Sequence, residues 1–123
     1  MAKIYMVDDD DAVRDSLTLL LESHGFDVAS FASAAEFAAA YRPNGSACLI
    51  LDQHLPGMSG LDFLASRQGA SLRLPVILIT GGSDQRIRDR ATALGVAAFF
   101  EKPVTEGPLL AAITRALTKA AVD

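Results

Sequence analysis

Five short apolar runs alternate along the chain with amphipathic stretches of helix length, and this alternation constrains the fold more than any other feature. The runs occupy residues 3–7, 26–31, 47–51, 75–79 and 97–100. Short apolar runs of this kind are typical of buried parallel strands. A strict alternation of strands and helices predicts a parallel sheet with right-handed crossovers. We therefore expect an α/β fold in which one domain fills residues 1–123.

The segments between the runs carry signals that begin and end helices. We expect helices over about residues 11–24, 34–41, 61–67, 84–94 and 106–119. Asp10 and Asp11 are suited to cap the first helix and to complement its positive end. Ser33 and Glu36 have the spacing of a capping box at the second helix. Gly25 follows the first helix and predicts its end.

Composition excludes several classes of protein. The chain has 123 residues, of which half are hydrophobic, and a net charge of −4. This length suffices for one substantial core, and the negative charge argues against direct nucleic-acid binding. No apolar run is long enough to span a bilayer, and acidic residues interrupt the N-terminal segment too early for a secretory signal. We therefore expect a cytoplasmic protein, with its single cysteine, Cys48, buried in a strand.

Polar residues follow four of the five apolar runs. Asp8 and Asp9 follow the first run, Asp52 the third and Thr80 the fourth, and Lys102 lies two residues beyond the fifth. The carboxyl ends of parallel strands meet at one edge of the sheet, where α/β proteins bind ligands. Taken singly, each residue could equally be a helix cap, a turn residue or a solvated charge. Their shared edge favours a joint role in one crevice.

These residue types suit a divalent cation beside a phosphoryl group. Close carboxylates suppress one another's ionisation unless a cation offsets them. Oxygen ligands without His or Cys side chains favour Mg²⁺ over zinc or copper. Asp52 is the best candidate nucleophile toward phosphorus, while Asp8 and Asp9 are better placed to hold the metal. Thr80 could donate a hydrogen bond to one phosphoryl oxygen, and Lys102 could pair with another.

The two histidines have weaker claims on the site. His24 lies near the end of the first helix, and we expect it to be structural. His54 lies close to the expected crevice, but the sequence identifies no partner for its side chain.

The ordered set of site residues resembles the receiver domain of bacterial two-component response regulators, over essentially the whole chain. The set comprises Asp8 and Asp9, the acceptor Asp52 with the sequence QHLPGMSG after it, Thr80, and Lys102 followed by a proline. Each piece alone is a weak signal, whereas the pieces in this order are specific. The segments around Thr80 and Lys102 are most similar to receivers of nitrogen-fixation regulators that carry a LuxR-type DNA-binding output.

The resemblance implies a flavodoxin-like, doubly wound (βα)5 fold with the strand order 2-1-3-4-5. It implies that Asp52 accepts a phosphoryl group from a sensor histidine kinase. The domain would then be a signalling module that catalyses only its own phosphorylation and dephosphorylation. The resemblance assigns Mg²⁺ to Asp9, Asp52 and the backbone carbonyl of His54, with Asp8 acting through water. Lys102 would contact the phosphoryl group.

The resemblance also implies a conformational switch. Thr80 would swing toward the phosphoryl group, and Phe99 would turn inward and remodel the face of the fourth helix, fifth strand and fifth helix. Many relatives have a tyrosine where Phe99 stands, so a hydrogen bond from a ring hydroxyl is absent here. The helix that carries Arg86, Arg88 and Arg90 belongs to this expected face. A solvated helix surface is the default interpretation of these arginines, and a partner surface is the alternative.

The sequence carries no output domain after the fifth helix, which leaves two alternatives open. The chain is either a stand-alone receiver that acts on a separate output protein, or the receiver part of a longer regulator with a DNA-binding output. A phosphorylation-dependent dimer stays open in both cases. In neither case do we expect this domain to bind nucleic acid or a membrane directly.

Two functions of other classes compete with the receiver interpretation. A phosphatase of the haloacid dehalogenase class would use Asp8 as the nucleophile and Asp10 as its partner, but the acidic pair expected beyond Lys102 is missing. A flavodoxin-like cofactor binder shares the fold, but a carboxylate-rich crevice would repel a flavin phosphate. Both remain as alternatives to be tested.

Overall fold

A five-stranded parallel sheet forms the centre of the molecule. The computed structural model describes residues 2–43, 45–82 and 84–122. The sheet has the order β2-β1-β3-β4-β5, which confirms the expected topology. Its strands are β1 (Lys3–Val7), β2 (Asp27–Phe31), β3 (Ala47–Asp52), β4 (Val76–Thr80) and β5 (Ala98–Glu101). The order reverses at β1 and β3, and this is where a doubly wound sheet opens a crevice for a ligand.

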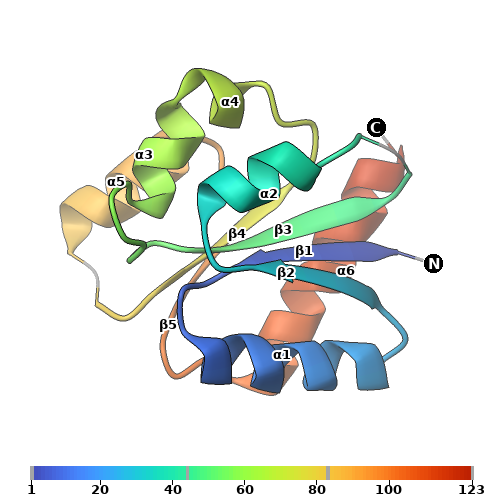
Figure 1. The fold of residues 1–123 in the computed structure, drawn as a ribbon. Coiled ribbons are helices and arrows are strands. Elements are labelled where there is room, and N and C mark those ends of the chain that lie inside the picture. The colour runs from blue at the N-terminus through green and yellow to red at the C-terminus, as the bar shows by residue number, and fades with distance from the viewer. Residues whose placement is uncertain (1, 44, 83, 123) are drawn as a thin grey trace.

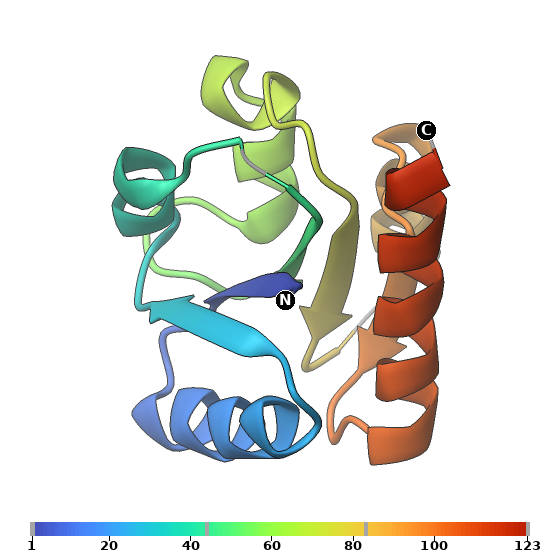
Figure 2. The same cartoon turned by 90° about the vertical axis from the view of Figure 1, so that its right-hand side faces the viewer.

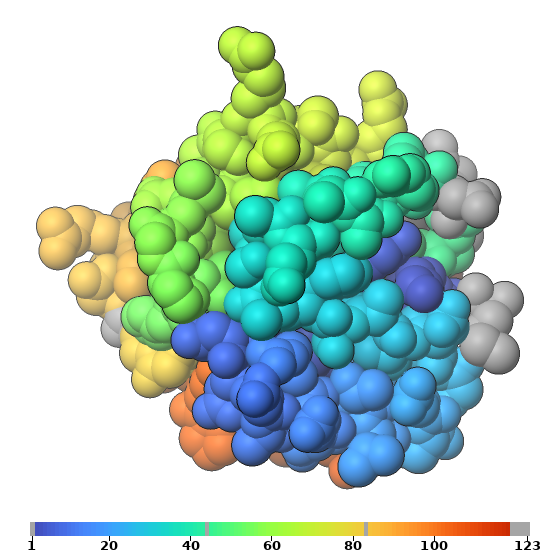
Figure 3. All heavy atoms as spheres, viewed as in Figure 1, coloured from blue at the N-terminus to red at the C-terminus, as the bar shows by residue number. Residues whose placement is uncertain are grey.

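Helices cover both faces of this sheet. They are α1 (Asp11–Ser23), α2 (Ala34–Ala40), α3 (Gly60–Ala65), α4 (Arg67–Ala70), α5 (Gln85–Ala93) and α6 (Glu106–Val122). Helices α1 and α6 lie on one side, and α2, α3 and α5 lie on the other (Figures 1 and 2). In the space-filling view the side chains of α1, α2 and α3 cover most of the face that is turned to the reader (Figure 3). Among the described residues, no helix is both long enough and apolar enough to cross a membrane.

Side chains of alternate strand residues pack into two separate hydrophobic cores, one on each face of the sheet. In β1, Ile4 and Met6 pack with residues of α1 and α6, whereas Val7 packs with residues of α2 and α3. The residues of β3 and β4 are buried without exception. Continuous burial is expected of central parallel strands, because helices cover both of their faces. Cys48 belongs to the α1 and α6 core, where it is fully buried and forms no disulfide, as expected.

The expected helix caps are present. The Asp10 carboxylate accepts hydrogen bonds from the backbone N–H groups of Ala12 at 2.9 Å and Val13 at 3.2 Å. Ser33 accepts from the N–H of Glu36 at 3.1 Å, so it caps α2 as the sequence predicts. Gly25 has a φ of 89°, the left-handed conformation that ends a helix after its C-cap.

The third helix differs from the expectation of one segment over residues 61–67. It ends at Ala65, and a separate short helix, α4, begins at Arg67. Ser66 breaks the helix because its backbone is extended, with a ψ of 167°, while its hydroxyl accepts from the N–H of Gly69 and caps α4. Gly69 also approaches the preceding helix so closely that a Cβ there would lie 1.9 Å from the Phe63 carbonyl oxygen. Serine favours such caps over helix interiors.

The strand register aligns the ends of the central strands. Val7 pairs with Leu51, Asp52 with Ile79, and Thr80 with Glu101. The residues just beyond these pairs therefore emerge side by side at one edge of the sheet.

Candidate functional site

The edge formed by the carboxyl ends of β1, β3 and β4 gathers the acidic residues. Asp8 is 4% exposed and Asp52 is 2% exposed, whereas Asp9 is exposed to solvent. One carboxylate oxygen from each of these three aspartates lies within 4.8 Å of those of the other two. Such an all-oxygen set fits a hard divalent cation such as Mg²⁺. Asp10, in contrast, directs its carboxylate to the start of α1.

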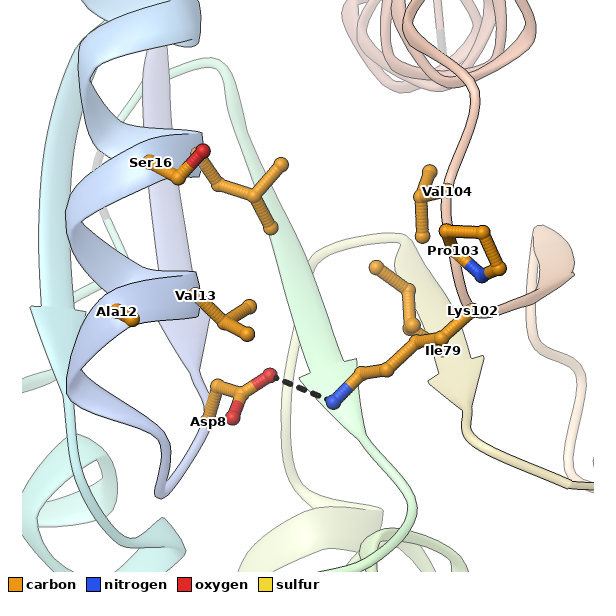
Figure 4. A pocket seen from close by; sticks show the side chains of 9 residues that line it. Asp8, Ala12, Val13, Ser16, Ile79, Lys102, Pro103 and Val104 are labelled. Carbon is orange, nitrogen blue, oxygen red and sulfur yellow. Dashed lines mark hydrogen bonds and ion pairs between the residues drawn. The ribbon is translucent and has the colours of Figure 1, made fainter.

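Lys102 reaches the same acidic cluster from the loop after β5. Its Nζ lies 3.2 Å from Asp8 Oδ2 and 3.4 Å from Asp52 Oδ2. Figure 4 shows the lysine side chain extended across the gap toward Asp8. One ammonium therefore bridges two buried carboxylates that come from different strands.

The charges of the cluster shift the pKa values of its members. Burial raises the pKa of Asp52, and the nearby charge of Asp8 raises it further, although the His54 N–H and the Lys102 ammonium oppose this rise. Burial lowers the pKa of Lys102, but the carboxylates of Asp52 and Asp8 outweigh burial, so that this pKa is raised overall. A single lysine thus leaves Asp52 in an environment that still disfavours its charged form. A bound cation would offset that cost.

Backbone and side-chain hydrogen bonds hold Asp8 in place. Its Oδ1 accepts from the N–H of Asp10 at 2.9 Å. The guanidinium of Arg14, which is mostly buried, donates to the Asp8 carbonyl at 2.6 Å and also pairs with the Asp11 carboxylate. Sequence reasoning missed Arg14. Its position three residues after Asp11, on the first turn of a helix, is the signal that could have suggested the pairing.

A close backbone packing holds Asp52 at the end of β3. The N–H of His54 donates to Asp52 Oδ1 at 3.3 Å, and the N–H of Gly60 donates to the Gln53 carbonyl at 3.0 Å. A Cβ on Gly60 would lie 2.6 Å from the backbone carbonyl oxygen of Asp52. The start of α3 therefore packs directly against the strand end that carries Asp52, and only glycine fits at position 60.

Thr80 is fully buried at the end of β4, and its hydroxyl makes local contacts. Its Oγ1 lies 2.5 Å from the carbonyl oxygen of Gly82 and 3.0 Å from Nε2 of His54. The sequence identifies no partner for the His54 side chain, whereas the structure places the Thr80 hydroxyl beside it. The register that pairs Asp52 with Ile79 is the signal that could have revealed it, since it brings the turns after β3 and β4 together.

Phe99 is half-buried on the neighbouring strand β5, where it packs against the core that faces α2, α3 and α5. The guanidinium of Arg88 lies 5.3 Å from the centre of its ring. Arg88 also pairs with Glu101 at 2.9 Å, and Arg90 pairs with Asp62 at 2.8 Å. Two of the three arginines in the cluster thus contact neighbouring elements. Arg86 is 94% exposed, as expected for a solvated helix face.

The remaining predicted residue, His24, lies outside this site. It follows α1 as the C-cap, with its Nε2 3.3 Å from Glu106 at the start of α6.

A pocket of about 550 Å³ lies beside the Asp8–Lys102 pair. Its walls are largely apolar, with Val13 from α1 facing Pro103 and Val104 from the loop before α6 (Figure 4). Leu17 of α1 also lines the pocket. The pocket shows that the ion pair borders an accessible groove.

Comparison with known proteins identifies the family. The response regulator receiver domain matches residues 4–114. The chain belongs to this family. It is 39% identical to the transcriptional regulatory protein FixJ of Azorhizobium caulinodans, over 96% of this receiver and 56% of that protein. It is 40% identical to the response regulator TodT of Pseudomonas putida strain F1, over 93% of the receiver and 50% of that protein.

Solved structures agree with this assignment. The response regulator StyR superposes with a TM-score of 0.89 at 37% identity, covering 98% of this receiver and 61% of that chain. The similarity to nitrogen-fixation regulators is confirmed by the match to FixJ. The receiver spans about half the length of the curated relatives it matches.

Proposed function

We propose that this receiver accepts a phosphoryl group on Asp52 from the phosphohistidine of a sensor histidine kinase. The proposal rests on one observation above all, the buried Asp52 carboxylate with two further carboxylates within 4.8 Å and the Lys102 ammonium at 3.4 Å. A carboxylate oxygen of Asp52 attacks phosphorus, the new P–O bond forms, and the P–N bond to the kinase histidine breaks. The electron pair of that bond returns to the imidazole of the kinase.

Asp9, Asp52 and the backbone carbonyl of His54 would hold Mg²⁺, with Asp8 acting through a water molecule. When it is bound, the cation would offset the negative charge of the phosphoryl oxygens. Lys102 has a separate task, because its ammonium already lies against Asp52. Once the carboxylate is phosphorylated to an acyl phosphate, the ammonium pairs with a phosphoryl oxygen and stabilises the added charge.

Thr80 and Phe99 would then carry the signal away from the site. The Thr80 hydroxyl turns to donate to a phosphoryl oxygen, and the Phe99 ring moves inward. This movement withdraws the ring from Arg88 and alters the face formed by α5, β5 and α6. A separate output protein, a DNA-binding output domain of a longer regulator, or a second receiver in a phosphorylation-dependent dimer would bind that face.

Phosphorylation is tested with acetyl phosphate and Mg²⁺, followed by intact-mass measurement of wild type and Asp52→Asn. We expect wild type to gain the mass of one phosphoryl group and Asp52→Asn to gain none. Equal labelling of both proteins would rule out Asp52 as the acceptor. Loss of labelling in Asp8→Asn together with a phosphoryl group mapped to Asp8 would instead favour a phosphatase of the haloacid dehalogenase class.

Lys102→Ala tests whether Lys102 contacts the phosphoryl group without contributing to the Mg²⁺ site. We expect this variant to retain Mg²⁺ binding, because the three carboxylates are unchanged, but to bind the phosphoryl mimic beryllofluoride at least tenfold more weakly. Calorimetric titration measures both affinities. Unchanged affinity for beryllofluoride would show that Lys102 is not the phosphoryl contact.

A further inference from the structure

Among residues 2–43, 45–82 and 84–122, three hydrogen bonds involve the Thr80 hydroxyl, and one of them comes from a side chain that the proposed chemistry does not use. The Thr80 Oγ1 lies 2.5 Å from the Gly82 carbonyl oxygen, 3.2 Å from the Gly82 nitrogen and 3.0 Å from Nε2 of His54. Thr80 is fully buried, whereas His54 is exposed in the loop after β3. The imidazole therefore links this loop to the end of β4.

The positions of the hydrogens follow from these distances. A hydroxyl has one hydrogen to donate and two lone pairs that accept. Two oxygens 2.5 Å apart require a hydrogen between them, so the Thr80 hydroxyl donates to the Gly82 carbonyl. The Gly82 N–H donates to one lone pair, and the His54 Nε2–H then donates to the other. The one hydrogen and both lone pairs of the hydroxyl thus have partners in the described part of the chain, and none of these partners is Asp52.

We infer that the His54 imidazole is a latch that holds the Thr80 hydroxyl away from Asp52. This inference rests on the proposed function, because it concerns the equilibrium of the same switch. To reach a phosphoryl oxygen, the hydroxyl must leave both the Gly82 carbonyl and the imidazole. The Gly82 contacts come from the backbone and would exist with any side chain nearby. The contact from position 54, in contrast, requires a side chain that carries a hydrogen-bond donor and is long enough to reach Thr80. The residue at position 54 therefore shifts the equilibrium between the two positions of the Thr80 hydroxyl.

His54 has separate backbone and side-chain contacts, which allows the two to be separated by mutation. Its backbone N–H donates to Asp52 Oδ1 at 3.3 Å. Its ring lies against the turn after β4, because a Cβ on Gly81 would be 3.8 Å from His54 Cδ2. Substitution of the side chain removes the ring contacts and keeps the backbone N–H and carbonyl. His54 is thus a positioning residue that acts on the phosphoryl group through Thr80.

The first measurement is the affinity for beryllofluoride in the presence of Mg²⁺, by calorimetry. If the protein binds beryllofluoride only when the latch is open, its apparent affinity is lower than the affinity of the open state. The reduction is in proportion to the fraction of molecules in which the latch is open. Loss of one hydrogen bond in His54→Ala should therefore tighten beryllofluoride binding by about three- to tenfold. His54→Gln, whose amide can donate, should restore affinity toward that of wild type. Met58→Ala, at an exposed position in the same loop, is the matched control and should be unchanged.

Two further results separate a latch from a general effect on the site. The affinity for Mg²⁺ alone is measured in His54→Ala and wild type as well, and a shift equal to that for beryllofluoride would overturn the latch, because it would place the effect at the metal site. In a Thr80→Val background the hydroxyl is absent, so His54→Ala should no longer tighten binding. An undiminished effect in that background would also overturn the latch. Thr80→Ala replaces Thr80→Val if the latter does not fold.

A measurement without phosphoryl chemistry distinguishes failure of the latch from failure of the proposed function. Three-bond couplings to the Thr80 methyl carbon report its χ1 rotamer by NMR. We expect the population of the second rotamer to be larger in His54→Ala than in wild type. Equal rotamer populations in both proteins overturn the latch. A larger second population in His54→Ala, in a protein that takes no phosphoryl group on Asp52, would support the latch and refute the proposed function.

Discussion

Asp52 is a carboxylate in a position where its charge is unfavourable. Its pKa is raised above 3.8 by burial and by Asp8. The folded chain therefore binds more protons than the unfolded chain just above that pH, and stability is lost as the pH rises through this window. We expect Asp52→Asn, studied without divalent cations, to be more stable than wild type at neutral pH, with the difference shrinking below the ordinary aspartate pKa. Urea unfolding across this pH range measures the effect, and equal stability at neutral pH would contradict it.

Gly60 is required by its close approach to Asp52. A Cβ would lie 2.6 Å from the Asp52 carbonyl oxygen, a distance that forces the start of α3 away from β3. We expect Gly60→Ala to lower the free energy of unfolding by about 1–3 kcal/mol. Gly107→Ala is the matched control, since nothing lies within 4 Å of a Cβ there. It should leave stability unchanged or slightly raised in chemical denaturation, because alanine favours a helix. An equal loss in both variants would refute the steric explanation.

At the residue scale, the sequence predicted which side chains meet at the sheet edge better than it predicted their individual contacts. Asp8, Asp9, Asp52, Thr80 and Lys102 were found because each lies at or just beyond the end of an apolar run, and the strand order brings these ends together. Two contacts were not predicted: the hydrogen bond between the His54 imidazole and Thr80, and the one from the Arg14 guanidinium to the Asp8 carbonyl. Both depend on side-chain rotamers and on the distance between neighbouring loops, which no local pattern encodes.

At the scale of elements, caps were predictable because they depend on residues two or three positions apart. The start of α1 divides the acidic run in two, with Asp8 and Asp9 facing the crevice and Asp10 capping the helix. The break at Ser66 was not predictable in this way. It accompanies the close packing of Gly69 against the Phe63 carbonyl, and residues 61–67 alone would support one continuous helix.

This division of the acidic run can be tested by substituting Asp10. Asp10→Ala removes the acceptor for two N–H groups and should cost about 1 kcal/mol of stability. Asp10→Asn keeps a capping oxygen and should cost much less. Neither change should alter Mg²⁺ affinity appreciably, whereas Asp9→Ala should weaken it. Thermal unfolding and calorimetric titration give the two readouts. A greater loss of Mg²⁺ affinity in Asp10→Ala than in Asp9→Ala would contradict this assignment.

At the scale of the whole molecule, the candidate metal site exists only in the folded chain. Asp8 and Asp52 are far apart in the sequence and meet through the pairing of β1 with β3. A ligand that binds only the folded state raises the free energy of unfolding in proportion to the logarithm of its concentration. Mg²⁺ should therefore stabilise every element of the fold, including those distant from the crevice.

We expect Mg²⁺ at a hundredfold excess over its dissociation constant to add about 2.7 kcal/mol to the unfolding free energy of wild type. Asp9→Ala should show a markedly smaller gain at the same concentration. Asp27→Ala is a control for acidic residues in general, because Asp27 lies at the start of β2, opposite the crevice, and pairs with Lys3. Its gain should equal that of wild type in urea unfolding with and without Mg²⁺. Equal gains in all three proteins would mean that the cation acts by general screening and not at this site.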